Sequence, residues 1–222
     1  MTDPAVAGRL VLVAGATSTS GHAATRALAG AGARVVAVGR DAERLAPTAR
    51  LGARVEVCDL SDEAAVAALR DRLHADGLRV DGIVHLVGGW RGGGGLAGQT
   101  EEDYRALEGG FTALRHVTRA FDDDLRASSA ARLAIVSSTA VARPLAGGAS
   151  YAAVKAASEA WIRAVAQGFA KAARDAGTPL HAAAVAFRVR GLAGLEDSLA
   201  ARFVDLWERS ADTINDTVLT LE

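Results

Sequence analysis

Short apolar runs rich in valine alternate along this chain with longer stretches rich in alanine. The apolar runs lack the apolar–polar alternation of a half-exposed strand, which indicates strands buried on both faces of a sheet. We expect strands at residues 9–14, 34–38, 54–57, 80–87, 132–137, 180–187 and 217–221. The alternation of these strands with helical stretches predicts right-handed crossovers and a parallel sheet.

These elements predict an α/β fold. It would contain a single doubly wound parallel sheet of the Rossmann type, with about seven strands and helices on both faces. A length of 222 residues suits one large domain, so we expect residues 1–222 to form a single domain. Helices are expected at 21–31, ending at Gly32, and at 149–176. Ser61 has the pattern of an N-cap, because Asp62 and Glu63 follow it.

Charge and hydropathy narrow the classes of function. The 25 basic and 26 acidic residues nearly cancel and form no basic stripe, so no nucleic-acid partner is expected. No apolar run approaches the ~18–20 residues that cross a bilayer. Asp3 lies where a signal peptide would carry positive charge, and a cytoplasmic protein without a membrane partner is expected. Cys58 is the single cysteine, which excludes an internal disulfide, and no residue is assigned to a metal.

A turn of small and hydroxyl residues follows the first expected strand and leads into a helix. A turn that binds phosphate lacks bulky side chains, so that backbone N–H groups and the positive end of the helix can approach the anion. We expect the closest approaches at the two glycines and hydroxyl donors between them. The candidate phosphate-binding residues are Gly15, Thr17, Ser18, Thr19, Ser20 and Gly21. A purely structural connection is the alternative interpretation.

Two charged residues at later strand ends fit the adenosine half of a dinucleotide. Arg40 follows the second strand, where an acid would accept hydrogen bonds from a free ribose hydroxyl and an arginine can pair with a 2′-phosphate. Asp59 ends the third strand and could accept a hydrogen bond from the adenine amino group. The alternatives are a solvated loop charge for Arg40 and a turn aspartate for Asp59. Arg40 favours NADP over NAD.

A glycine-rich segment at residues 88–98 contains seven glycines in eleven residues, directly after the fourth strand. It is either a flexible surface loop or a loop over a ligand, because ligands of open α/β sheets bind beyond the carboxyl ends of the strands. Trp90 and Arg91 within it are candidate substrate contacts.

Tyr151 and Lys155 are four residues apart in an expected helix, so the phenol and the ammonium share one face. A neighbouring cation lowers the pKa of a phenol, and the pair could act as a general acid/base. The chain holds 23 arginines but only two lysines, which fits a need for a compact ammonium at this position.

Ser138 lies thirteen residues before Tyr151, at the end of a strand. Its hydroxyl could bind a substrate carbonyl and stabilise charge as it becomes an alkoxide. Ser137 competes for this role, but alternate residues of a strand point to opposite faces and only one of the two is expected to serve.

Together these residues resemble the short-chain dehydrogenases/reductases over nearly the full chain, from Arg9 onward. The resemblance implies a Rossmann-type catalytic domain that binds NADP, or NAD, and interconverts a carbonyl and an alcohol on a small organic substrate. Tyr151 would transfer the proton and contact the cofactor, Lys155 would lower the tyrosine pKa and bind the nicotinamide ribose, and Ser138 would orient the substrate. Members of this family commonly form dimers or tetramers, so a homodimer or homotetramer is expected.

The chain departs from the pattern of this family at several positions. Ala14 and Thr19 replace a threonine and a glycine of the usual turn. The Asn-Asn-Ala-Gly segment after the fourth strand becomes residues 85–88, which retain only Gly88, also assigned to the cofactor. The helix asparagine that completes the catalytic tetrad is replaced near Gly110, and the Pro-Gly after the sixth strand is matched to residues 187–188. His85 is either a replacement polar group or a satisfied histidine at a strand end.

The leading hypothesis is therefore an NAD(P)H-dependent oxidoreductase with Tyr151 as general acid/base. The altered cofactor segments keep a second hypothesis open, a dehydratase, isomerase or cyclase on the same fold. A nucleotide-sensing protein without turnover is the third, although sensing alone would not need the serine, tyrosine and lysine together.

Overall fold

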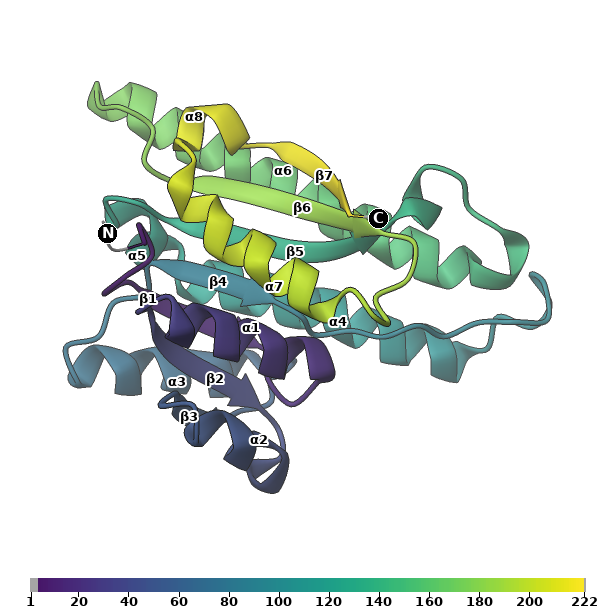
Figure 1. Ribbon diagram of the computed structural model, residues 1–222. Helices are drawn as coiled ribbons and strands as arrows, with labels where there is room; N and C mark the ends of the chain where they lie inside the picture. The colour runs from purple at the N-terminus through teal and green to yellow at the C-terminus, as the bar shows by residue number, and fades with distance from the viewer. Residues whose placement is uncertain (1–3, 222) are drawn as a thin grey trace.

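A computed structural model describes residues 4–221. Within these residues, seven strands form one parallel sheet in the order β3-β2-β1-β4-β5-β6-β7 (Figure 1). The strands are β1 (Leu10–Ala14), β2 (Arg34–Gly39), β3 (Arg54–Val57), β4 (Gly82–His85), β5 (Arg132–Ser138), β6 (Ala183–Val189) and β7 (Thr217–Leu221). The predicted α/β fold with a doubly wound parallel sheet is confirmed.

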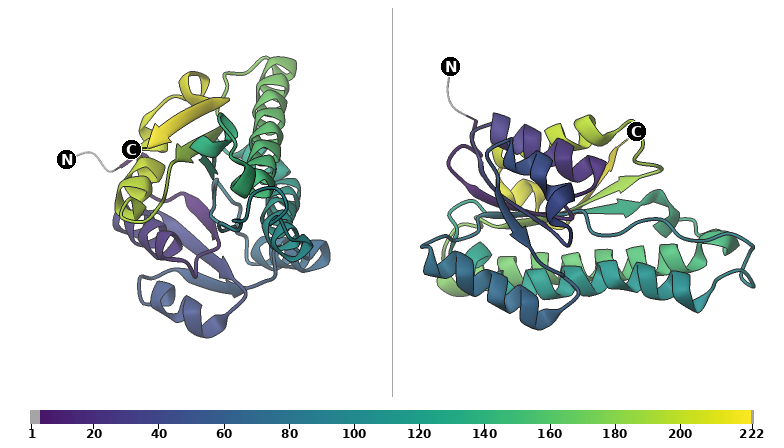
Figure 2. Two further views of the ribbon diagram at one scale, coloured as in Figure 1. Left: turned by 90° about the vertical axis from the view of Figure 1, so that its right-hand side faces the viewer. Right: turned by 90° about the horizontal axis from the view of Figure 1, so that it is seen from below.

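Helices cover both faces of this sheet (Figure 2). Helices α3, α4 and α6 pack on one face, and α1 and α7 pack on the other. The helices of residues 4–221 are α1 (Thr19–Gly30), α2 (Ala42–Ala49), α3 (Glu63–Ala75), α4 (Glu101–Ala120), α5 (Asp122–Ala127), α6 (Ala149–Ala176), α7 (Glu196–Asp205) and α8 (Ala211–Ile214). None of these helices is long and apolar enough to cross a membrane.

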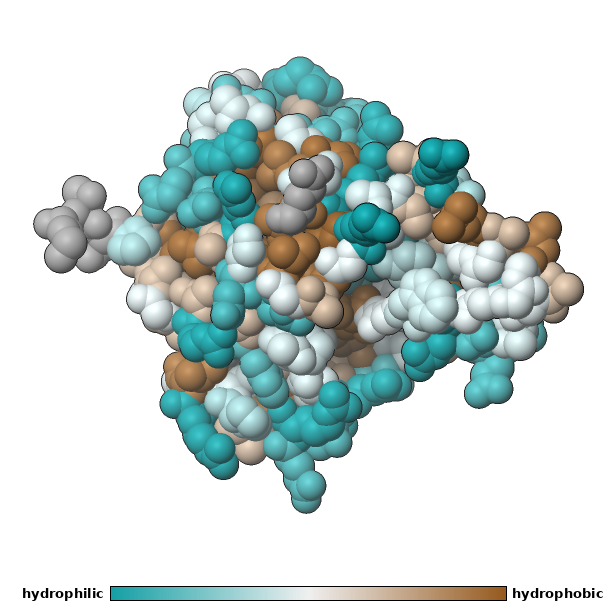
Figure 3. Space-filling view, turned by 45° about the vertical axis from the view of Figure 1, so that its right-hand side comes forward, coloured by the Kyte–Doolittle hydropathy of each residue, from teal (hydrophilic) through white to brown (hydrophobic). Residues whose placement is uncertain are grey.

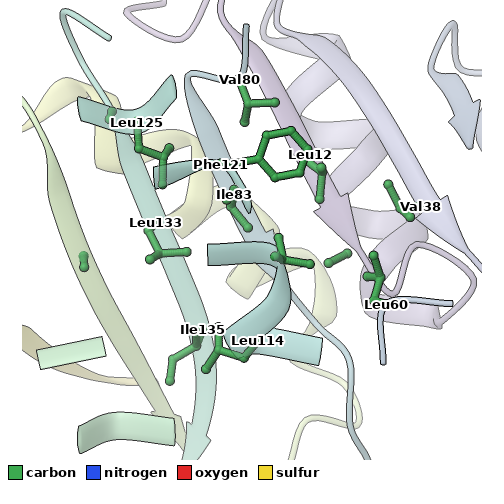
Figure 4. Close-up of a cluster of buried hydrophobic side chains, with 14 of the residues drawn as sticks. Leu12, Val38, Leu60, Val80, Ile83, Leu114, Phe121, Leu125, Leu133 and Ile135 are labelled. Carbon is green, nitrogen blue, oxygen red and sulfur yellow. The ribbon is translucent and has the colours of Figure 1, made fainter. Parts of the chain in front are cut away.

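The core on the α4 side of the sheet joins strand and helix residues (Figure 4). Leu12, Ile83 and Leu133 come from β1, β4 and β5, and they pack with Leu114 and Phe121 at α4. Each of these side chains is 1% exposed or less. Burial of one such side chain stabilises the fold by about 1.5–3 kcal/mol, so this core fixes α4 against the centre of the sheet.

The structure corrects several predicted boundaries. β4 ends at His85 rather than at residue 87, and β6 spans Ala183–Val189 rather than 180–187. Helix α1 begins at Thr19, two residues early. Ser61 is not the N-cap of α3, because Asp62 accepts hydrogen bonds from the first backbone N–H groups of that helix.

The strand order reverses direction between β1 and β4. The chain leaves β1 for β2 and β3 on one side, and then crosses to β4 on the other. Helices that follow neighbouring strands on either side of such a point leave a crevice beyond the carboxyl ends of the strands. The fold therefore places a crevice at the ends of β1 and β4.

Candidate active site

Two adjoining cavities occupy the carboxyl edge of the sheet. The larger is about 980 Å³ and reaches Tyr151, while the smaller is about 570 Å³ and reaches Arg40. Both are lined by Ser18, Val87 and Gly88, so they meet at the switch point. Figure 3 shows this hollowed side of the molecule, with hydrophobic side chains in the depth of the hollow. The two cavities form one elongated groove with a separate end on each side of the switch point.

The turn after β1 lines the groove where the two cavities meet, a part that we call the waist. Not every turn residue expected to bind phosphate lines the groove. Gly15 has φ +85°, and a Cβ atom there would lie 2.9 Å from the carbonyl carbon of Leu86. Glycine is therefore required where the turn and the end of β4 approach each other. Thr17 and Ser20 line the groove, whereas Thr19 is exposed and lines neither cavity.

Ser18 and Gly21 serve the turn itself. The Ser18 hydroxyl donates to the Gly15 carbonyl at 3.0 Å and accepts from the Gly21 N–H at 3.0 Å. A Cβ atom at Gly21 would lie 2.6 Å from the Gly15 carbonyl oxygen. The Ser18 hydroxyl and the Gly21 N–H are both used within the turn, and the phosphate contacts expected of Ser18 and Gly21 stay predictions. Ser18 caps α1, and Gly21 permits close packing of the helix on the turn.

The smaller cavity carries an excess of positive charge. Arg40 and Arg44 line it, and the Arg44 guanidinium donates to the Thr17 carbonyl at 3.3 Å. Asp59 also lines it, and its carboxylate accepts from the Ser61 hydroxyl at 2.6 Å. Hydrogen bonds from Ser61 lower the pKa of Asp59, and Arg40 lowers it further. Asp59 is thus hydrogen-bonded within its turn, and it also contributes an ionised carboxylate to the lining of the smaller cavity.

Ser138, Tyr151 and Lys155 all line the larger cavity. Ser138 lies at the end of β5 and accepts from the Ala140 N–H at 3.1 Å. The Lys155 ammonium donates to the Val136 carbonyl at 2.7 Å and lies 5.8 Å from the centre of the Tyr151 ring. Ser137 lines neither cavity and donates to Glu159, which agrees with the alternation of side chains along the strand.

The pKa values of this group follow from burial. Burial raises the pKa of the Tyr151 phenol, and its hydrogen bond with Ser138 acts in the opposite direction. Lys155 is not among the causes of this shift, and the expected lowering of the tyrosine pKa by Lys155 stays a prediction. Burial also lowers the pKa of Lys155 to about 8, against the opposing charge of Glu159. The phenol is protonated at neutral pH, which suits a proton donor.

The two candidate substrate contacts of the glycine-rich segment lie in different cavities. Trp90 lines the larger cavity, whereas Arg91 lines the smaller one beside Arg40. The segment is tied to the start of α6, because the Gly93 N–H donates to the Gly147 carbonyl at 2.7 Å. The Gln99 side chain, which no sequence motif indicated, donates to the same carbonyl at 3.0 Å and accepts from the Ser150 N–H. These contacts hold the loop beside Tyr151.

An ion pair anchors α6 to the sheet behind this site. The Arg188 guanidinium donates to both oxygens of Glu159, at 2.8 and 2.6 Å, and Ser137 donates to the same carboxylate at 2.5 Å. Glu159 is 6% exposed. Burial tends to raise its pKa, but the bonds from Arg188 and Ser137 outweigh it and the pKa is lowered. The cluster joins β5, β6 and the helix that carries Tyr151 and Lys155.

Two departures from the family pattern have a structural account. Residues 187–188 lie inside β6 and do not follow it, so their match to the Pro-Gly is wrong. Arg190 and Gly191 follow the strand and line the larger cavity. At Gly110 a Cβ atom would lie 3.1 Å from the Val87 carbonyl oxygen, so α4 presses its backbone against the end of the groove.

Comparisons with known proteins agree with this fold. A family model described as short chain dehydrogenase matches residues 9–173. No curated relative matches the sequence. Similar solved structures include the RhlG/NADP active-site complex of Pseudomonas aeruginosa, at 22% identity and TM-score 0.85, covering 100% of this chain and 98% of that chain.

Two further structures have the same fold. An L-sorbose reductase from Gluconobacter frateurii, complexed with NADPH and L-sorbose, is 17% identical with TM-score 0.83, covering 100% of this chain and 97% of that one. A gluconate 5-dehydrogenase from Burkholderia cenocepacia, in complex with NADP and tartrate, is 21% identical with TM-score 0.83, covering 99% and 96%. The family match spans well over half of the sequence, and the chain belongs to the short-chain dehydrogenases/reductases.

Proposed function

We propose that this protein is an NAD(P)H-dependent oxidoreductase that interconverts a carbonyl and an alcohol on a small organic substrate. The observation that carries the proposal is the convergence of Ser138, Tyr151 and Lys155 on one cavity, which continues across the switch point into a second, cationic cavity. The membership of the chain in the short-chain dehydrogenases/reductases supports it.

The residues of the groove fit a nicotinamide dinucleotide. Gly15 and Gly88 both have positive φ, and they border the waist, where a pyrophosphate would pass closest to the backbone. The smaller cavity offers Arg40 and Arg44 at the adenosine end, and the larger offers Lys155 at the nicotinamide end. Three similar structures contain NADP or NADPH, which supports the same cofactor class here.

The cavity side chains have complementary roles in such a reaction. A bound nicotinamide supplies or accepts the hydride. The Tyr151 phenol donates a proton to the substrate oxygen during reduction, and its raised pKa means that the phenol carries this proton at neutral pH. The Ser138 hydroxyl accepts from Ala140 and lies within hydrogen-bonding reach of Tyr151, so a substrate oxygen bound beside the phenol would accept its hydrogen and be stabilised as negative charge develops.

Purified protein incubated with NADPH and a panel of aldehydes, ketones, keto sugars and keto acids tests the proposal. We expect NADPH oxidation and alcohol formation in equal amounts. Substrate conversion without any change of the nicotinamide would instead support a dehydratase, isomerase or cyclase. Tight cofactor binding with no conversion across the panel would support nucleotide sensing.

Removal of Arg40 should distinguish the two cofactors. In Arg40→Ala we expect NADPH to bind about 10–100-fold more weakly, because a charged hydrogen bond to a 2′-phosphate contributes about 1.5–3 kcal/mol. NADH affinity should stay within about twofold of the wild type. Titration of both cofactors, followed by nicotinamide fluorescence, measures the ratio. Arg34→Ala is the matched control, because Arg34 is an exposed residue at the opposite end of β2.

Arg44→Ala is expected to act in the same direction as Arg40→Ala, since both arginines line the smaller cavity. An equal loss of NADPH and NADH affinity in either variant would contradict a 2′-phosphate site. Such a loss would assign the arginine to a part that both cofactors share.

A further inference from the structure

His85 is a buried histidine with one satisfied and one unsatisfied ring nitrogen. It ends β4, is 5% exposed, and its Nε2 lies 3.2 Å from the Gly110 carbonyl oxygen. A carbonyl only accepts hydrogen bonds, so the ring proton lies on Nε2 and Nδ1 carries a lone pair. Across residues 4–221, Nδ1 has no hydrogen-bond partner. Burial lowers the His85 pKa to about 4, so the ring is neutral and Nδ1 is an acceptor.

A small cavity lies between His85 and the catalytic lysine. Its volume is about 20 Å³, and its lining includes His85, Gly110, Tyr151, Lys155 and Ser158. About 10–15 Å³ is enough for one water molecule, provided that the site offers two or more polar partners. The cavity therefore has the size of a site for a single water.

The hydrogen-bonding groups around this cavity are complementary. An ammonium has three N–H donors. Within the described chain Lys155 uses one of them, on the Val136 carbonyl. A water would accept from a second donor of Lys155 and donate to Nδ1 of His85, so it would satisfy Nδ1 and give the ammonium a second acceptor. The Ser158 hydroxyl does not compete, because it donates to the Val154 carbonyl at 2.9 Å.

The position of Gly110 explains why the acceptor comes from β4. A Cβ atom at Gly110 would lie 3.1 Å from the Val87 carbonyl oxygen and 3.3 Å from the Gly88 Cα atom. A side chain at position 110 therefore does not fit unless its neighbours shift, and the Gly110 carbonyl already accepts a hydrogen bond from His85. The glycine on the helix and the histidine on the strand therefore act as one unit.

We propose that His85 holds a water molecule against the Lys155 ammonium and so positions the charged end of the catalytic group. His85 is a positioning residue, since it acts through the water and the lysine. Its effect on turnover rests on the proposed oxidoreductase function, whereas the water and the hydrogen bonds do not.

The chain offers a direct measurement because it contains only two lysines, Lys155 and Lys171. In protein labelled with ¹⁵N-lysine, two side-chain signals report their pKa values by NMR, and Lys171→Arg assigns them. We expect Lys155 to titrate near 8 in the wild type. In His85→Leu its pKa should fall by about one unit, because the ammonium loses a hydrogen-bonded acceptor. Lys171 is the internal reference, and its signal should not move.

Two further variants separate the hydrogen bond from a packing effect. His85→Gln retains a donor for Gly110 and an acceptor for the water, and we expect it to keep the wild-type pKa of Lys155. Ser158→Ala changes the wall of the same cavity without removing a partner of the water, so it should also leave that pKa unchanged. An equal shift in His85→Leu and Ser158→Ala, or no shift in His85→Leu, would overturn the proposal.

The state of the histidine is tested in the wild type alone. ¹⁵N-histidine NMR should show the proton of His85 on Nε2 and an Nδ1 signal shifted by an accepted hydrogen bond. A proton on Nδ1 would overturn the assignment even if every His85 variant failed to fold. These measurements need no substrate, so a failure to detect carbonyl reduction leaves their result intact. Where turnover is found, the pH profile of kcat should move with the Lys155 pKa.

Discussion

Tyr151→Phe is expected to lower kcat for carbonyl reduction by about 10²–10⁴-fold, the usual contribution of a positioned general acid. Among the described residues that line the larger cavity, the phenol is the only group that combines a removable proton with a pKa raised by burial. NADPH affinity should change little, because the variant retains Lys155 and the glycine turn. Steady-state kinetics with a substrate found in the carbonyl panel provide the measurement.

The control is Tyr104→Phe, since Tyr104 is the other of the two tyrosines in the chain and lies on α4 outside both cavities. Its kcat should match the wild type. Equal kcat values for Tyr151→Phe and the wild type would remove the tyrosine from the mechanism, even if the protein proved to be a reductase.

The same tyrosine sets an expected pH dependence. Burial raises its pKa above the ordinary value of about 10, so the proton donor is present across the neutral range and is lost only at more alkaline pH. Reduction should therefore persist to alkaline pH, whereas alcohol oxidation, which needs the ionised phenol, should increase as pH rises.

Glu159→Leu is expected to lower the free energy of unfolding by about 3 kcal/mol. Removal of one member of a buried pair leaves the other uncompensated, which costs about 3–5 kcal/mol, and the lower end applies because the Arg188 side chain is 26% exposed. For a chain of this size the Tm should fall by about 6–12 °C. Urea unfolding and differential scanning calorimetry measure both quantities.

Asp175→Ala is the matched control, because it breaks an exposed ion pair with Lys171 on the same helix. Its effect should stay within about 0.5 kcal/mol. The Glu159 contribution is present at neutral pH and is lost as pH falls through its lowered pKa, so wild type and variant should converge in acid. Equal stability of Glu159→Leu and Asp175→Ala at neutral pH would contradict a structural role for the pair.

Local patterns were sufficient to predict the fold. The apolar runs located all seven strands of the described chain. The five inner strands are almost wholly buried on both faces, which leaves few polar positions in the pattern, whereas the edge strands β3 and β7 are partly exposed. Boundaries were less well predicted. Leu86 and Val87 are as apolar as β4, but they leave the sheet to line the groove, and no feature of their composition signals that turn.

The candidate residues selected from the sequence were those with a partner close by in the chain. Tyr151 and Lys155 are one helical turn apart. Ser137 and Ser138 are consecutive residues of a strand, so their side chains point to opposite faces of the sheet. Arg44, Gln99 and Glu159 were not selected, because their partners lie on other elements and the sequence carries no periodic trace of such contacts. The raised pKa of Tyr151 was missed for a related reason, since burial depends on the complete fold. Cytoplasmic location, the single domain and the homo-oligomeric state remain predictions.

The central position of β1 has a consequence for how the chain folds. Val11 pairs with Val35 on one side and with the much more distant Gly82 on the other. The first pairing closes a short loop, whereas the second must wait for β3 and α3 to be made, and contacts between distant residues slow folding. We expect the half that contains Arg40 and Asp59 to acquire structure first during synthesis. The groove would then be completed late, when β4 docks and brings Gly88 to the glycine turn.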